Sequence, residues 1–270
     1  MFISTGISLL GAQPSGGGGL WTPADITTYG WYDASDASTI TLSGTDVTAW
    51  DDKSGNGFTA TQTGSDNPTY ATALVNGLNS VEFGNDDGTS ARGFGFLDTA
   101  NLGLGLVASS YAFFASYARY AGLTINHLIG GGVGSTNKNL HCGYDNNTQL
   151  RIAQFGNDTS VLVPGYTTTQ DAIVTGLNDS GIDKIIRDNG GLYETIRANS
   201  NDLSDNQGFA IGRFINNSFL FKGRINEMVF LNSFPSTSDR DKIEGYLAWK
   251  WGTEASLPVT HPYKYTPPTT

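Results

Sequence analysis

The stretch AIVTGLNDSGIDKIIRDNGGLYETIR, residues 172–197, contains three short runs separated by turn residues. Ala172–Leu177, Lys184–Arg187 and Leu192–Ile196 are rich in β-branched residues, and such runs predict strands. Between the last two runs stands Asp188–Gly191, in which Asn and Gly tolerate the positive φ of a tight reversal. Parallel pairing would need a long crossover connection, so the stretch predicts an antiparallel hairpin.

The same pattern continues from Trp21 to about Pro235, with clusters of Gly, Asn, Asp and Ser between short apolar runs. Many short strands without alternating helices are typical of an antiparallel sandwich. We therefore predict an all-β fold of two antiparallel sheets. The other strand candidates are Tyr29–Asp33, Val47–Trp50, Ser80–Phe83, Ser109–Tyr117, Gln149–Gln154, Gly208–Gly212 and Phe219–Leu231.

One short C-terminal helix is expected after the last strand. Within Arg240–Trp251 apolar residues recur at helical spacing, and Gly252 follows them. Ser236 and Asp239 can cap free backbone N–H groups at the start of this helix. Residues 257–270 contain four prolines and no amphipathic pattern, so we expect an extended tail over the surface.

The composition agrees with a fold rich in turns. Glycine accounts for 35 of the 270 residues, nearly twice the usual share of roughly 7 %. Of the 25 acidic residues 20 are Asp, which turns favour over Glu. With 38 % hydrophobic residues the chain can build one large core.

The net charge of −10 argues against a nucleic-acid partner, because binding phosphates needs a basic surface. No apolar run reaches the roughly 18 to 20 residues of a membrane span, so no membrane partner is expected. The single cysteine, Cys142, cannot form a disulfide within the chain, and we interpret it as a small buried hydrophobe.

Four segments resemble a known family. Trp31–Asp36 reads WYDASD, Trp50–Gly57 reads WDDKSGNG, Gly223–Phe230 reads GRINEMVF and Asp239–Trp251 reads DRDKIEGYLAWKW. They resemble the opening and closing segments of laminin-G-like, concanavalin A-like jelly-roll domains of bacterial surface proteins and bacteriophage structural proteins. The resemblance spans about residues 29–265. It implies a jelly-roll sandwich and says little about activity.

The matched residues have structural interpretations that need no ligand. In Ser54–Gly57 the Gly and Asn residues suit a tight reversal, and Asp52 can accept hydrogen bonds from its N–H groups. A calcium or glycan contact at this turn is the alternative. We expect the tryptophans of the motifs to pack the sandwich and the helix rather than to bind sugars: Trp31, Trp50, Trp249 and Trp251.

Three regions are expected: an arm with a glycine-rich tether at 1–19, the jelly-roll domain at 20–256, and the tail at 257–270. The tetraglycine Gly16–Gly19 marks the first boundary. The arm lacks the basic residues of a signal peptide. We predict that it anchors the protein in an assembly, and a disordered tail or an extra strand of its own sheet is the alternative. Its apolar residues are Phe2, Ile3, Ile7, Leu9 and Leu10.

No catalytic or cofactor-binding residues are predicted. The five Glu residues are isolated from one another in sequence, whereas glycosidases use paired carboxylates. The three His residues have no spacing typical of a metal site. The weak candidates for calcium are four loop acids, for which solvated loops are the alternative: Asp86, Asp87, Asp202 and Asp205.

Candidate glycan-binding residues are aromatic side chains next to polar ones, because sugars stack on exposed rings. Tyr117, Arg119 and Tyr120 could form such a platform, and so could Tyr144 beside Asp145. The alternative is that these are aromatics of edge strands.

The leading functional hypothesis is a non-enzymatic bacteriophage virion protein, such as a capsid decoration, head-fibre or tail-fibre component. Its arm would contact other virion proteins, its sandwich would adhere to host-surface glycans, and it would form a homo-oligomer. The alternative is a free-standing carbohydrate-binding, lectin-like module or bacterial surface adhesin, placed outside the cell or at its surface. A glycoside hydrolase comes third.

Overall fold

A computed structural model describes residues 19–62, 67–84, 96–99, 101–121, 123–164, 169–198, 201–214 and 219–270. Residues 1–18 of the predicted arm and tether, and the calcium candidates Asp86 and Asp87, lie outside these residues. The role of the arm therefore stays a prediction.

The first sheet is antiparallel. In spatial order it contains β1 (Gly30–Asp33), β17 (Gly223–Leu231), β8 (Tyr111–Arg119), β13 (Ala172–Asp179), β14 (Asp183–Asp188) and β15 (Tyr193–Ala198). At the start of β17 it continues into β6 (Leu78–Phe83) and β5 (Thr69–Val75).

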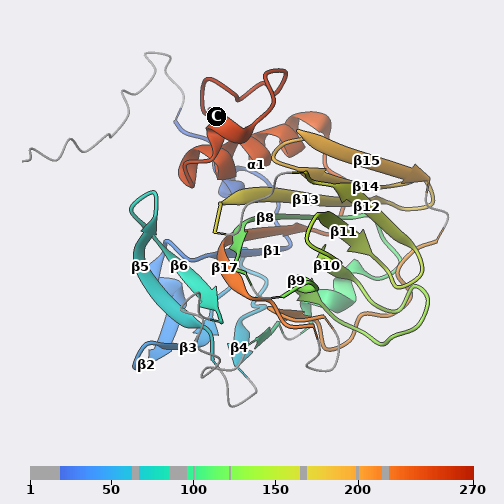
Figure 1. The fold of residues 1–270 in the computed structure, drawn as a ribbon, viewed down its shortest axis with the longest axis horizontal. Helices are drawn as coiled ribbons and strands as arrows, with labels where there is room; N and C mark the ends of the chain where they lie inside the picture. The colour runs from blue at the N-terminus through green and yellow to red at the C-terminus, as the bar shows by residue number, and fades with distance from the viewer. Residues whose placement is uncertain are drawn as a thin grey trace, which may run out of the picture.

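The second sheet is also antiparallel and packs against the first (Figure 1). Its strands are β12 (Asp158–Leu162), β11 (Gln149–Ala153), β10 (His141–Tyr144), β9 (Asn126–Gly130), β16 (Ala210–Ile211), β7 (Leu97–Asp98), β4 (Ala60–Gln62), β3 (Asp46–Trp50) and β2 (Ile40–Ser43). A pairing of β3 with β5 joins the two sheets. The predicted two-sheet antiparallel sandwich is confirmed.

Helix α1 (Thr237–Lys250) lies on the outer side of the first sheet, against β8 and β13 (Figure 1). The described residues also form four 3₁₀ turns: η1 (Pro23–Asp25), η2 (Ala37–Thr39), η3 (Leu102–Leu106) and η4 (Glu254–Ser256). Among the described residues, no helix combines the length and hydrophobicity needed to span a membrane.

Strand β8 is buried on both faces because it lies between two cores. Phe113 and Tyr117 point between the sheets, whereas Phe114 points toward α1 and packs with Ile243 and Leu247. Successive side chains of a strand face opposite sides, so a strand covered on both sides reads as a continuous apolar run.

The predicted hairpin and helix are confirmed. Asn189 and Gly190 have φ of 45° and 67°, the left-handed conformation that the turn requires. At the start of α1, the Ser236 hydroxyl accepts a 3.1 Å hydrogen bond from the Asp239 N–H. The expectation of an extended tail is wrong for residues 258–264, which form turns. Trp249 donates to the Tyr263 carbonyl at 2.8 Å, and this contact holds the turns against α1.

A fully buried carboxylate ties α1 to the first sheet. Glu227 of β17 accepts hydrogen bonds at Oε1 from the Trp31 indole at 2.7 Å and the Tyr246 hydroxyl at 2.9 Å. Its Oε2 accepts from the Trp251 indole at 2.9 Å and lies 2.8 Å from the Lys250 ammonium. Burial raises the pKa of Glu227, although Lys250 opposes the rise. Residues of three of the four motif segments thus meet at Glu227.

The turn after β3 has the predicted structural role. Oδ1 of Asp52 accepts from the backbone N–H groups of Trp31 at 2.9 Å and Ser54 at 2.8 Å. Its Oδ2 accepts from the Phe58 N–H at 3.2 Å. Trp31 and Trp50 are buried as expected, and so is Cys142. Burial raises the pKa of the Cys142 thiol well above its usual value.

Candidate functional site

A row of residues crosses the outer face of the second sheet. Gly143 on β10 lies between His127 on β9 and Arg151 on β11 and pairs with both. Arg151 in turn pairs with Ser160 on β12. Gly143 has no side chain, so the row is open between His127 and Arg151. A Cβ at Gly143 would lie 2.5 Å from the Cα of His127, so only glycine allows this approach of β9 to β10.

Two neighbours of Gly143 along the chain complete the hollow. His141 and Asp145 are two residues before and after it, and this spacing places them on the same face of the sheet. The rings of His127 and His141 are 5.2 Å apart between centroids. Phe214 stacks on His127 at 4.9 Å and meets the edge of His141 at 4.2 Å.

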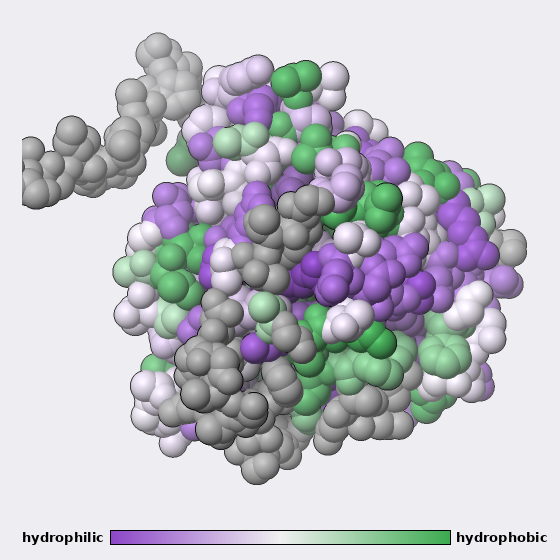
Figure 2. Space-filling model, in the orientation of Figure 1, coloured by the Kyte–Doolittle hydropathy of each residue, from purple (hydrophilic) through white to green (hydrophobic). Residues whose placement is uncertain are grey.

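The result is a cavity of about 340 Å³. Its other walls include the half-exposed rings of Phe155 and Phe219. Figure 2 shows a hydrophilic band beside hydrophobic residues in the region of β9–β12. We call this cavity the histidine pocket; its lining is Ile125, His127, His141, Asp145, Arg151, Phe155, Gly156, Asp158, Phe214 and Phe219.

Arg151 forms a fixed polar wall of the histidine pocket. Its Nε donates to the Ser160 hydroxyl at 3.0 Å, and its Nη1 lies 3.4 Å from the Asp158 carboxylate. Its Nη2 forms an ion pair with Asp145. Burial raises the pKa of Asp145, and the Arg151 guanidinium opposes this. The guanidinium plane and two carboxylates therefore present donors and acceptors side by side.

The two histidines are neutral at physiological pH. Burial, helped by the charge of Arg151, lowers the pKa of His127 to about 3. Burial also lowers the pKa of His141 well below its usual value, and its Nδ1 lies 2.6 Å from Asn139 Oδ1. Both ring nitrogens of His127 are buried without a hydrogen-bond partner. Such groups are rare in folded proteins and indicate a site that a ligand or ordered water completes.

The predicted glycan platform is wrong in its placement. Tyr117 and Tyr144 are fully buried, and the Tyr117 hydroxyl donates to that of Tyr144 at 3.1 Å. Arg119 lies 3.9 Å above the Tyr144 ring, and Tyr120 donates to Glu82. Arg119 and Tyr120 are each 3 % exposed. These side chains form the interior of the sandwich, so no sugar can stack on them.

The remaining calcium candidates are not brought into a three-ligand site. Asp202 accepts a 2.7 Å hydrogen bond from the Ser180 hydroxyl, and Asp205 accepts one from the Gln207 N–H at 3.2 Å. In the described parts of the chain, neither belongs to a group of three acids, histidines or cysteines close enough to hold one ion. Asp202 instead binds the turn between β13 and β14, and Asp205 binds its own loop.

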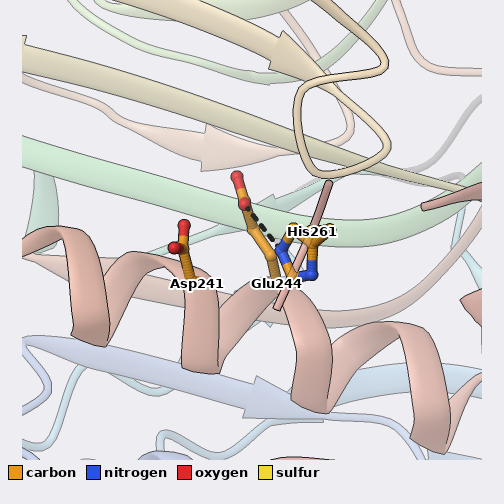
Figure 3. Close-up of side chains that lie close together, drawn as sticks. All are labelled: Asp241, Glu244 and His261. Carbon is orange, nitrogen blue, oxygen red and sulfur yellow. Dashed lines mark hydrogen bonds and ion pairs between the residues drawn. The ribbon is translucent and has the colours of Figure 1, made fainter. Parts of the chain in front are cut away.

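One such group does exist, formed by Asp241 and Glu244 of α1 with His261 (Figure 3). Glu244 already accepts from Arg187 Nε at 2.9 Å and from the Thr175 hydroxyl at 2.8 Å. Burial would raise the pKa of Glu244, but the hydrogen bond from His261 and the charge of Arg187 lower it. A cation would have to displace a guanidinium, so the group fits an ion-pair cluster better than a metal site.

Sequence reasoning missed the pocket residues His127, His141, Arg151 and Phe214. His127 and His141 are distant in sequence and become neighbours only when β9 pairs with β10. A usable signal was present in HCGYD, residues 141–145, where polar residues and Gly alternate with Cys and Tyr. This alternation predicts one polar face around a glycine.

Comparison with known proteins places the fold. No protein-family model and no curated protein sequence matches the chain. Domain 4 of an extracellular arabinanase from Geobacillus stearothermophilus, solved in complex with arabinotriose, has a TM-score of 0.56 and 18% identity. The match covers 81% of this chain and 98% of that one.

Two other solved structures are similar over most of this chain. The botulinum neurotoxin serotype G binding domain has a TM-score of 0.54 and 10% identity, and the match covers 86% of this chain and 54% of that one. Trypanosoma rangeli sialidase has a TM-score of 0.53 and 13% identity, with 82% and 33% covered. At these identities the likeness establishes a shared β-sandwich fold.

Proposed function

We propose that the protein is a glycan-binding module and that the histidine pocket holds a neutral sugar. The observation that carries this proposal is the row His127, Gly143 and Arg151. Under the Phe214 ring, it places His127 ring nitrogens that make no hydrogen bond beside the Arg151–Asp145 ion pair, with Nε2 3.8 Å from Asp145 Oδ1. The sequence analysis gave a carbohydrate-binding module as the alternative function, but it named other residues as the binding site.

A sugar matches the chemistry of the pocket. Its C–H face is apolar and packs on aromatic rings, here Phe214, Phe155 and Phe219. Its hydroxyl groups both donate and accept, so they suit the carboxylates of Asp145 and Asp158 together with the donors of Arg151. The volume of about 340 Å³ suits one or two sugar rings.

The charges favour a neutral sugar over an acidic one. Of the described residues that line the pocket, Arg151 is the cation, and its guanidinium already pairs with Asp145 and Asp158. The histidines add no positive charge because their pKa values are lowered. A sialic acid carboxylate would therefore meet two carboxylates and no free cation.

The arabinanase domain solved with the neutral sugar arabinotriose supports the proposal through its similar fold. Catalysis is not required by the site, because both of its carboxylates are engaged by Arg151. We retain the hypothesis of a non-enzymatic protein, in keeping with a lectin-like module or surface adhesin.

The test is a glycan array followed by calorimetry with arabinotriose and with sialyllactose. We expect neutral glycans to bind better than sialylated ones. Phe214→Ala and Arg151→Gln should each weaken binding about tenfold or more, since each removes a stacking or charged hydrogen-bonding partner.

Phe234→Ala and Arg240→Gln are the matched controls. Phe234 is 38 % exposed and lies outside the pocket lining, and Arg240 pairs with Asp241 of α1. Both controls should bind as the unchanged protein does. A blank array, or full binding by Phe214→Ala and Arg151→Gln, would refute the proposed site.

The bacteriophage virion role remains our second proposal and depends on residues 1–19. The sequence features behind it are the apolar arm and the tetraglycine tether. Deletion of residues 1–19 should abolish incorporation into particles and leave glycan binding intact. Retained incorporation would contradict anchoring by the arm.

A further inference from the structure

A second cavity, of about 530 Å³, shares no lining residue with the histidine pocket. It opens between the β14–β15 hairpin and the turns that follow α1. We call it the Asp188 cavity; its lining includes Asp188, Tyr193, Leu257, Val259 and Lys264. None of the residues discussed for glycan binding contributes to it.

Strand alternation directs Asp188 into this cavity. Arg187, one residue earlier on β14, points to the opposite face and pairs with Glu244 of α1. Asp188 ends the strand and sits opposite Tyr193 of β15, which also lines the cavity. The Asp188 side chain is 1 % exposed.

The Asp188 carboxylate is half satisfied. Its Oδ2 accepts a 3.0 Å hydrogen bond from the Asn189 side chain, whereas its buried Oδ1 has no hydrogen-bond partner. Burial raises the pKa of Asp188 to about 7. A buried carboxylate oxygen without a donor is costly unless something pairs with it.

No described cation that lines the cavity neutralises this carboxylate. Lys264 lines it too, but its ammonium donates to the carbonyl of Glu254 at 3.2 Å and to that of Ala255 at 2.5 Å. His261, near Gly190, faces Glu244 at 3.3 Å. The ionised Asp188 carboxylate is therefore not paired with a cation among the described residues that line the cavity.

The remaining walls are mostly apolar. They combine side chains from the residues just after β12, the β14–β15 hairpin and the turns after α1: Val163, Pro164, Leu192, Leu257, Pro258 and Val259. A ligand that fits must bring a charged donor to Asp188 and an apolar body to these walls.

We propose that the Asp188 cavity binds a primary alkylammonium compound, whose ammonium group donates to Asp188 Oδ1 while its alkyl chain packs on Leu192, Leu257 and Val259. An ammonium group supplies both the hydrogen bond and the positive charge that the carboxylate lacks. This site is independent of the histidine pocket and of its proposed glycan.

The test compares n-hexylamine with 1-hexanol, which has the same alkyl chain and no charge. Binding is measured by NMR titration on the full chain at about pH 8, where the Asp188 carboxyl is mostly ionised. We expect hexylamine to bind about tenfold or more tightly than hexanol, because a charged hydrogen bond is worth more than a neutral one. Equal affinities, or no binding of the amine, would overturn the proposal.

Asp188→Asn keeps the side-chain shape and should reduce the amine affinity to that of hexanol. Asp183→Asn, at the other end of β14 and partly exposed, is the matched control and should bind the amine normally. Amine binding that survives in Asp188→Asn would locate it elsewhere. Phe214→Ala changes only the histidine pocket and should leave amine binding unchanged. The outcome of the amine titration is therefore independent of whether the histidine pocket binds a glycan.

Discussion

At the scale of single residues, Glu227 of β17 brings together three of the four motif segments, which lie far apart in sequence. Trp31 comes from β1, and Tyr246 and Trp251 come from the end of α1 and the residue after it. Each donates one hydrogen bond to the same carboxylate, and Lys250 supplies the counter-charge. A buried carboxylate with a full set of donors fixes the position of α1 because any displacement leaves a charge unpaired.

We predict that Glu227→Gln lowers the free energy of unfolding by about 3 kcal/mol, because removing one partner of a buried ion pair leaves unsatisfied groups in the interior. Urea denaturation would measure this. Glu194→Gln is the control: this side chain is 31% exposed, and partly exposed pairs contribute about 0–1 kcal/mol. A loss for Glu227→Gln no larger than that of the control would contradict this role.

At the scale of elements, a helix or strand was predicted from the sequence when neighbouring residues alone determine its conformation. The helix was found because its spacing and the Ser236 cap are read within a few residues. Strand β10 was not found, because HCGY lacks the β-branched residues that mark a strand. Its conformation comes from pairing with β9 and β11 on either side, which is a tertiary interaction.

Ser236→Ala should destabilise the protein by about 1 kcal/mol through the loss of the N-cap hydrogen bond to Asp239. Ser238→Ala, inside the first turn of α1, is the matched control and should be neutral or slightly stabilising, since Ala favours a helix more than Ser does. Thermal unfolding distinguishes the two. Equal effects of the two substitutions would mean that the cap contributes nothing.

At the scale of the whole molecule, the sandwich buries titratable groups whose effects on stability oppose each other. The pKa of His127 is about 3 in the folded protein, so as pH falls below 6.5 this side chain takes up a proton in the unfolded chain before it does so in the folded one. Protonation of His127 therefore lowers the free energy of unfolding as pH falls. The pKa of Asp188 is about 7 in the folded protein, so as pH rises Asp188 keeps its proton longer in the folded state than in the unfolded one. The stabilisation from this bound proton is present at low pH and is lost as pH rises toward 7.

Between about pH 4 and pH 6.5 we expect the two contributions to cancel in part. His127→Gln should make stability fall more steeply with rising pH, and Asp188→Asn should make it rise more steeply. Each slope should change by up to about 1.4 kcal/mol per pH unit. Urea midpoints measured across this range would test the signs, and slope changes of the same sign in both variants would refute the assignment.

The amino-acid pattern alone was enough for the antiparallel sandwich, the Asp188–Gly191 turn and the single helix, because turn residues and apolar periodicity act over neighbouring positions. Whether an aromatic side chain faced solvent could not be read from it, and Tyr117 and Tyr144 proved to be interior. Both candidate cavities depend on strand register: Gly143 opens a gap between His127 and Arg151, and alternation on β14 turns Asp188 away from Arg187. Register is a property of paired strands, so these sites exist only in the folded molecule.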